Sequence, residues 1–330
     1  MKVTTSAPAD PAAAPPFPRR GGSRGADSGP PRRIRRGTGL ADLAGVGPPL
    51  ALFGLFIVVP MIAAVALSFL RWNGLGSPQW VGGANWAQFL HDPVAHQSLL
   101  VTAKVIGLSW VVQTPISMAL GLFTAGRQRY RSVYAAIYVL PLLVSTAGIA
   151  LIFEALLDPT FGGLTALARG LHLSFLQQNW LGSPDLTLYV IVAIIAWQFI
   201  PFHTLLYQVG RRQIPVVLYE AATLDGASPA RVFWRITLPQ LRYTIITSSI
   251  LMLVGALTYF DIIFIMTDGG PGYATRVLSL DMYNAAFMQD EYGYASVLAV
   301  ILGVIGIAVA IGLVRLTGFS SMASQQEGAA

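Results

Sequence analysis

The chain has 330 residues, of which 54% are hydrophobic and only 11% are charged. Soluble domains carry about 25% charged residues, so this composition lacks the polar shell of a soluble protein and predicts a membrane protein. The absence of cysteine excludes disulfides, thiolate metal sites and cysteine nucleophiles. The formal net charge of +6 does not indicate nucleic-acid binding, because the basic residues are distributed by membrane side and form no single patch.

Residues 1–40 are rich in Pro, Gly, Ala, Ser and Arg and contain few large apolar residues. Such a segment cannot bury enough apolar surface to fold, so we expect a disordered basic tail. Its three Arg-Arg pairs are a weak signal for export. The long apolar run that follows is more typical of an uncleaved anchor.

Six long windows without charged residues follow the tail, and each is long enough to cross a bilayer, which takes about 20 residues. The sequence therefore predicts an all-α membrane protein with six transmembrane helices in residues 41–318 and a short C-terminal tail at 319–330. The windows are Leu43–Leu70, Val105–Gly126, Ser132–Phe153, Leu186–Gly210, Tyr243–Phe260 (extendable to Thr267) and Tyr292–Val314.

Most of the 21 Lys and Arg residues fall in the tail, in the second and fourth connections between windows, and just after the last window. Cytoplasmic loops carry the excess of basic residues. We therefore expect both termini, residues 125–133 and residues 211–242 in the cytoplasm. The opposite face receives only Arg71, Lys104, Arg169 and Arg276.

Four windows contain a proline, namely Pro60, Pro115, Pro141 and Pro201. Each proline removes one backbone hydrogen bond and is expected to bend its helix. A break exposed to lipid is costly, so these positions are expected to face other helices or a cavity. A pore that changes shape can use such bends, and a fixed scaffold geometry is an equal alternative.

A charged island separates the fourth and fifth windows. Pro215 suits the first turn of a helix, and Val216–Leu224 favours helix. Gly226 can adopt the left-handed conformation that ends a helix, and Ser228-Pro229 reads as the N-cap and first turn of a second helix. The sequence thus predicts a helix, a glycine turn and a helix at the membrane surface. An ordinary amphipathic hairpin is the alternative.

This island resembles the signature loop of ABC importer permeases: Glu-Ala-Ala, a glycine six residues after the glutamate, then Ile-x-Leu-Pro. The resemblance implies that residues 211–242 form a coupling loop that docks on a cytoplasmic ABC ATPase dimer. The residues implied in coupling are Glu220, Ala221, Ala222, Asp225, Gly226, Ile236, Leu238 and Pro239.

Other segments resemble the first-type membrane subunit of maltose and oligosaccharide importers. This wider resemblance implies the type I ABC importer permease fold in a bacterial plasma membrane. It also implies a second permease, an extracellular solute-binding protein and a di- or oligosaccharide cargo. The segments are Ser68-Phe-x-x-Trp72-Asn73, Asn85-Trp86, Asp92-Pro93, Leu140-Pro141, Asp158-Pro159, Phe260-Asp261, Thr267-Asp-Gly-Gly-Pro271 and Gly293-Tyr-Ala-Ser296.

The chain carries no ATP-binding signature. The pattern Gly-x4-Gly-Lys-Ser/Thr needs a lysine, and the only lysines, Lys2 and Lys104, lie in other contexts. We therefore expect no catalytic residue and no cofactor on this chain, with ATP and Mg²⁺ bound by the partner ATPase. The four histidines lack metal-ligand spacing, so no metal site is expected.

Two faces of the fourth and fifth helices combine aromatic, small and polar residues. Gln198 and Phe202 lie four residues apart, and Gly255, Ala256 and Tyr259 share a second face. A sugar site needs aromatic faces and a few hydrogen-bonding groups, so these five residues are expected to line the substrate path. Simple helix packing is an equal alternative.

Two ionisable residues, His203 and Asp261, fall within the predicted helices. Such residues often mark function. Here His203 is more typical of a core residue that is hydrogen-bonded to the chain, and the resemblance makes Asp261 structural or gating.

Three other classes stay open at this point. They are an ABC importer permease for a non-sugar solute, an ATPase-independent secondary transporter or channel, and a membrane enzyme. A secondary transporter predicts matched interrupted helices in two repeats, and no convincing pair is present. No catalytic constellation supports an enzyme.

Overall fold

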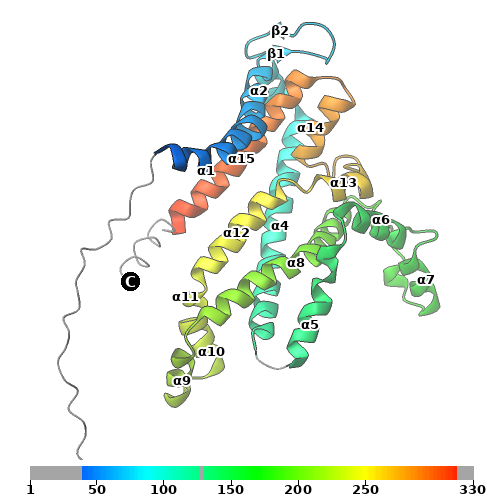
Figure 1. Ribbon diagram of the computed structural model, residues 1–330. Coiled ribbons are helices and arrows are strands. Elements are labelled where there is room, and N and C mark those ends of the chain that lie inside the picture. The colour runs from blue at the N-terminus through cyan, green and yellow to red at the C-terminus, as the bar shows by residue number, and fades with distance from the viewer. Residues whose placement is uncertain (1–38, 127–128, 318–330) are drawn as a thin grey trace, which may run out of the picture. The chain divides into compact units, whose positions relative to one another are not determined.

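The computed structural model describes residues 39–126 and 129–317 and divides the chain into two units, residues 1–54 and 55–330 (Figure 1). In the first unit it describes α1 (Gly39–Phe53), an apolar helix that contains Pro48 and Pro49. Nearly all of the expected N-terminal tail and the whole C-terminal tail lie outside the described residues. Gly39 and Leu40, which were assigned to the tail, begin α1.

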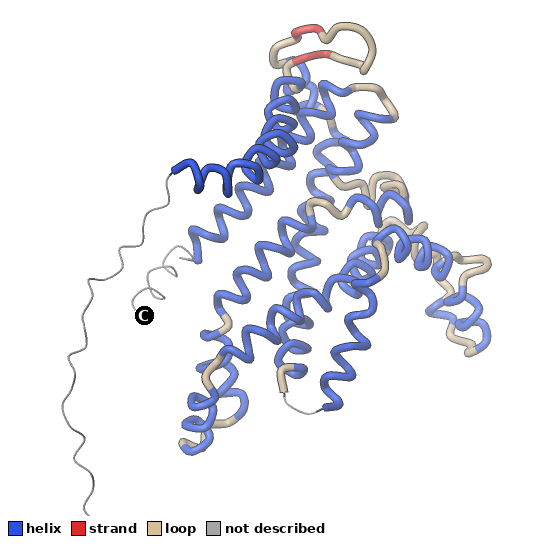
Figure 2. Tube along the Cα trace, in the orientation of Figure 1, coloured by secondary structure: helices blue, strands red, loops and turns tan. Residues whose placement is uncertain are grey.

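The described part of the second unit is mostly helical, with one short β-hairpin (Figure 2). A π-helical turn η1 (Gly54–Val58) leads into it from the first unit. Its elements in chain order are α2 (Val59–Leu67), β1 (Leu70–Arg71), β2 (Gln79–Trp80), α3 (Ala84–His91), α4 (Pro93–Thr124), α5 (Arg129–Val139), η2 (Leu140–Leu143), α6 (Thr146–Leu157), α7 (Gly163–Gly170), η3 (Ser174–Leu176), α8 (Thr187–Gln213), α9 (Val216–Leu224), α10 (Pro229–Val232), η4 (Phe233–Thr237), α11 (Leu238–Gln240), α12 (Arg242–Ala256), α13 (Phe260–Thr267), α14 (Leu278–Phe287) and α15 (Tyr292–Thr317).

Four described helices are long and apolar enough to cross a membrane: Gly45–Leu67, Pro93–Thr124, Thr187–Gln213 and Tyr292–Arg315. Two further stretches qualify only as bent pairs. Val133–Leu143 and Thr146–Leu157 meet at 93°, and Arg242–Ala256 and Phe260–Thr267 meet at 43°. The described residues therefore hold four to six candidate spans, and each overlaps one of the six windows expected from the sequence, although the second span begins twelve residues before its window and includes Lys104.

The third window is not one helix, contrary to expectation. Pro141 lies in the 3₁₀ turn η2, Val144 is extended, and the Ser145 side chain caps α6 by accepting a hydrogen bond from the Gly148 N–H at 3.2 Å. A serine N-cap starts a new helix in a new direction. By contrast, α4 and α8 continue through Pro115 and Pro201 without a break.

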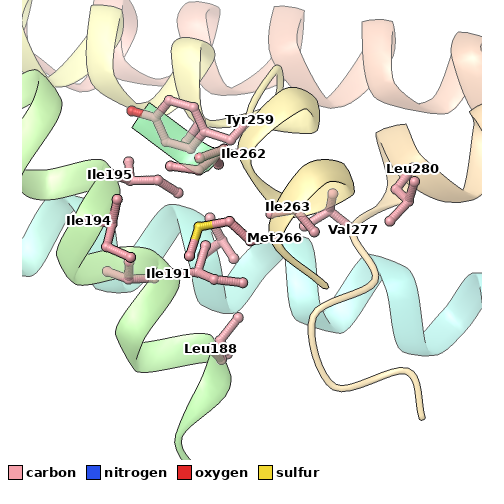
Figure 3. Packing of buried hydrophobic residues seen from close by; sticks show 14 of the residues in the cluster. Leu188, Ile191, Ile194, Ile195, Tyr259, Ile262, Ile263, Met266, Val277 and Leu280 are labelled. Carbon is pink, nitrogen blue, oxygen red and sulfur yellow. The ribbon is translucent and has the colours of Figure 1, made fainter. Parts of the chain in front are cut away.

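The core of the second unit lies where α8 packs against α13, α6 and α4. Ile191 and Ile195 of α8 are fully buried in one cluster with Ile262 and Ile263 of α13, and Figure 3 shows Ile195 beside Ile262. Val105 of α4 joins the same cluster. Helices in lipid associate through close packing and interhelical hydrogen bonds, so this cluster fixes α13 against α8.

Helix α4 packs closely against α8 at Gly121. A Cβ at this position would lie 2.5 Å from the Tyr207 Cβ and 2.9 Å from the Thr204 carbonyl oxygen. One turn away, the Gln208 Nε2 donates to the Thr124 carbonyl oxygen at 2.9 Å. Small residues that let backbones approach are typical of membrane helix interfaces, so Gly121 is required for the α4–α8 contact.

This contact predicts opposite outcomes for two glycine substitutions in α4. Gly121→Ala places a methyl group against the α8 backbone and is expected to lower the thermal unfolding temperature in detergent, by the equivalent of about 1–3 kcal/mol. Gly107→Ala is the matched control, because nothing lies within 4 Å of its Cβ position. It should leave the temperature unchanged or slightly higher. Equal losses in both variants contradict the account of the α4–α8 contact.

Candidate functional site

The loop between α8 and α12 forms the helix–glycine–helix arrangement expected from the sequence. Gly226 has φ +66° and follows the C-cap of α9, with its N–H donating to Thr223 O at 3.1 Å. The Ala227 N–H donates to Ala222 O at 2.9 Å. These two bonds are the Schellman pattern that ends a helix at glycine.

The second short helix of this loop also begins as expected. The Ser228 hydroxyl accepts a hydrogen bond from the Arg231 N–H at 3.4 Å, and Pro229 occupies the first turn of α10. Pro215 differs slightly from expectation, because it is the N-cap of α9 and not a residue of its first turn. Its ψ of 130° is extended, so the chain enters the helix one residue later.

The inner face of this loop is tied to both neighbouring helices. The Arg211 guanidinium at the end of α8 lies 3.8 Å from the centre of the Tyr219 ring. The Tyr219 hydroxyl lies 3.1 Å from the Thr237 Oγ1, just before α11 and α12. Cation–π contacts of this kind contribute about 0.5–1 kcal/mol at exposed sites. These two contacts join α9 to the end of α8 and to the segment just before α11 and α12.

The outer face of the loop is exposed and mixes acidic and apolar residues. Glu220, Ala221, Asp225 and Pro239 are exposed, Ile236 and Leu238 are half-buried, and Ala222 is buried. Sequence reasoning missed two large residues on this face, Leu224 at 89% and Trp234 at 65% exposed. The sequence feature that could have identified them is a large apolar side chain within the charged island between the fourth and fifth windows. Exposed apolar patches of this type mark protein contact sites.

A second feature is a cavity of about 360 Å³ between α8, α12, α13 and the start of α6. It brings together three of the five residues expected to line a path, namely Phe202, Gly255 and Tyr259. Thr146 and Asp261 also line it, from the start of α6 and from α13. A Cβ at Gly255 would meet nothing within 4 Å, so this residue leaves the cavity open.

The other two expected residues lie beside the cavity and not on its lining. Gln198 is buried, and its Nε2 donates to the Thr146 Oγ1 at 3.1 Å, which holds a hydroxyl that does line the cavity. Ala256 is buried in the core cluster with Ile262. Face assignment from sequence put Ala256 on the Gly255 side, whereas adjacent residues on a helix point about 100° apart.

The cavity wall combines aromatic rings with polar groups. The Phe199 and Tyr259 rings stack at 5.4 Å between centroids. His203 lines the cavity too, and its Nδ1 lies 2.9 Å from the Ser248 Oγ of α12, so it is the hydrogen-bonded core residue expected from sequence. Asp261 is exposed and forms no salt bridge in the described part of the chain. Such a wall can hold a polar, ring-shaped solute.

The segment after α13 is held by its own polar contacts. The Thr267 and Thr275 hydroxyls lie 2.9 Å apart, and Thr275 also donates to Gly270 O at 2.8 Å. Beyond them Arg276 contacts Asp281 at 2.6 Å. Burial raises the pKa of the Asp281 carboxyl above its ordinary value, because desolvation outweighs the opposing effect of the Arg276 guanidinium.

Residues 39–126 and 129–317 contain no group of three or more His, Asp or Glu side chains that could hold a metal ion. What the cavity offers is therefore rings, hydroxyls, an imidazole and one carboxylate.

Comparison with known proteins places these features in a family. Residues 113–318 match the model of the binding-protein-dependent transport system inner membrane component. A probable ABC transporter permease protein of Pyrococcus horikoshii is 33% identical, over 80% of this chain and 91% of that protein. The trehalose/maltose transport system permease protein of Thermococcus litoralis is 32% identical, over 82% of this chain and 92% of that protein.

A solved structure shares the fold. A chain of a bacterial alginate ABC transporter, in complex with a periplasmic protein that holds an alginate pentasaccharide, superposes with a TM-score of 0.76. It is 20% identical and covers 86% of this chain and 96% of that chain. The ATPase-independent transporter and the membrane enzyme considered above do not fit this family. The chain belongs to the binding-protein-dependent inner membrane components, the permease subunits of ABC importers, and has their type I fold.

Proposed function

We propose that this chain and a second permease together form the translocation path of an ABC importer for a di- or oligosaccharide. An extracellular solute-binding protein delivers the sugar. The observation that carries the proposal is the link between the cavity and the loop: α8 and α12 supply the cavity wall and also flank residues 211–242. Relatives named for trehalose, maltose and other sugars support this class of cargo. A non-sugar solute is the alternative.

ATP hydrolysis is assigned to a partner ATPase dimer, which also binds the Mg²⁺. The support is that neither lysine of the chain stands in an ATP-binding pattern. The outer face of α9 and α10, with Glu220 and Asp225 beside the exposed Leu224, is the proposed docking surface. Coupling is assigned to the eight residues that the resemblance implies, namely Glu220, Ala221, Ala222, Asp225, Gly226, Ile236, Leu238 and Pro239.

The proposed topology has six crossings, with residues 41–318 as the permease domain. The bent pairs each count as one crossing, and both termini and residues 211–242 lie in the cytoplasm of a bacterial cell. The basic residues of the tail and of the loop support this orientation. Reporter fusions at Gly226 and Gly272 distinguish it from the inverse, since only the first should read cytoplasmic.

The proposed path runs through the 360 Å³ cavity. Phe202, Gly255 and Tyr259 form its surface, and Gln198 and Ala256 support it from behind. A neutral sugar needs ring faces and hydroxyl partners more than charge, and the stacked Phe199–Tyr259 pair and Thr146 match that need.

The docking proposal predicts a specific loss of coupling. Glu220→Lys reverses a charge on an exposed side chain and is expected to abolish sugar uptake in membrane vesicles while the protein still inserts, because the docking surface is lost. Asp185→Lys makes the same charge change on an exposed residue before α8, away from the loop, and should retain uptake. Normal uptake in Glu220→Lys contradicts the docking role.

The path proposal predicts a block by bulk. Gly255→Trp fills the cavity and should reduce sugar uptake at least tenfold, with the importer complex still assembled on purification. Gly107→Trp adds the same side chain at an exposed α4 position with no neighbour within 4 Å, and is expected to transport. If Gly255→Trp transports normally, or fails to assemble, the α12 face serves packing and not the path.

A further inference from the structure

Several sequence segments that the membrane cavity does not use converge in one place. Trp72-Asn73, Asn85 and Gly293-Tyr294 are far apart in the chain, yet they line one cavity of about 240 Å³. It lies where the hairpin β1–β2, α3 and the start of α15 meet. In the second unit this is the opposite end of the helices from α9 and α10 (Figure 1). In the proposed topology it opens to the outside.

The walls of this outer cavity are fixed by backbone contacts. The Asn85 Nδ2 donates to Ser68 O at 2.9 Å and to Leu70 O at 2.8 Å. The Tyr292 N–H donates to Trp72 O at 3.1 Å. A Cβ at Gly293 would collide with Leu70 O, so only glycine lets α15 approach the hairpin this closely. The cavity is therefore shaped before any ligand arrives.

Its polar groups have unused hydrogen-bonding capacity. Asn85 is buried and lines the cavity, and both of its described bonds come from the amide nitrogen, which leaves Oδ1 as an acceptor. The side chains of Arg71, Gln289 and Asp290 make no hydrogen bond or salt bridge among the described residues. The Gln88 Nε2 donates to the Glu291 Oε2 at 3.2 Å, so the amide oxygen of Gln88 stays free.

The charges and the ring suit one kind of ligand. One guanidinium faces two carboxylates, so the lining favours no strongly charged ion of either sign. Trp72, which also packs on Tyr292 at 5.5 Å between ring centroids, adds an aromatic surface. Amide, carboxylate and guanidinium groups around an indole bind vicinal hydroxyls and the apolar face of a ring. The volume is below the roughly 300–1,000 Å³ of sites for larger ligands.

We propose that this outer cavity is a saccharide subsite that takes one neutral, hydroxyl-rich ring of the cargo before it enters the membrane cavity. The inference rests on the proposed function for the class of cargo, but it concerns a separate site on different elements. Gln88 and Gln289 are the specificity-determining side chains of this site, since both are exposed and line it.

The test uses the full chain, purified in nanodiscs with the subunits that accompany it, and saturation-transfer NMR. The probes are maltotriose, trehalose and N,N′-diacetylchitobiose. We expect saturation to be transferred from the protein to the ring protons of at least one of these sugars. Gln88→Ala and Gln289→Ala should each weaken its binding about fivefold, the effect of one lost hydrogen bond. Gln79→Ala on β2 is the matched control, an exposed glutamine outside the cavity, and should bind normally.

A second variant separates this site from the membrane cavity. Gly255→Trp should retain the signal, because the outer cavity contains no α12 residue. If Gly255→Trp removes the signal and Gln88→Ala does not, the sugar binds only in the membrane cavity, and the subsite is wrong while the proposed function stands. Absence of any signal also overturns the subsite. A third outcome also overturns the subsite: no sugar binds, glycerophosphoethanolamine does bind, and its binding is lost in Gln88→Ala. The cavity is then a lipid headgroup site.

Discussion

Backbone N–H and C=O groups within a membrane need hydrogen-bond partners inside the protein. This constraint acts on the chain at the break between α12 and α13. Thr258 donates from its N–H to Gly255 O at 3.0 Å and from its hydroxyl to the same carbonyl at 2.8 Å. The Phe260 N–H donates to Thr258 O at 2.7 Å. These bonds give the N–H groups of Thr258 and Phe260 partners at the point where the two helices meet at 43°.

The rest of the site depends on that bend. It sets Tyr259 against Phe199 of α8 and places Asp261 at the cavity, while Ile262 and Ile263 anchor α13 in the core. The preceding helix, α12, begins directly after the loop that carries Glu220 and Gly226. A bent helix with a buried far end and an accessible near end can change its bend when the near end is moved. We propose that the loop and the cavity move together in this way.

Local chemistry made part of this structure predictable. The α9–α10 turn follows from Gly226 and Ser228, because a left-handed glycine and a serine cap act within a few residues. The membrane spans follow from charge-free windows. Pro141 predicted a bend in the third window, but neither its angle of 93° nor the hairpin β1–β2 was predicted, since neither leaves a local pattern strong enough to read. The burial of Ala256 depends on α13 and α6, which lie next to it only in the folded chain.

Because the chain lacks cysteine, one introduced cysteine is the only thiol of this subunit. The most direct measurement is the rate at which Leu251→Cys, on the exposed rim of the cavity, reacts with a small maleimide in the assembled importer, with and without ATP and vanadate. The account predicts that the reaction rate changes severalfold when ATP and vanadate trap the nucleotide. It also predicts that trapping leaves the rate unchanged in a chain that carries Glu220→Lys as well. A rate that is the same in both nucleotide states, with ATPase activity intact, contradicts coupling between the loop and the cavity.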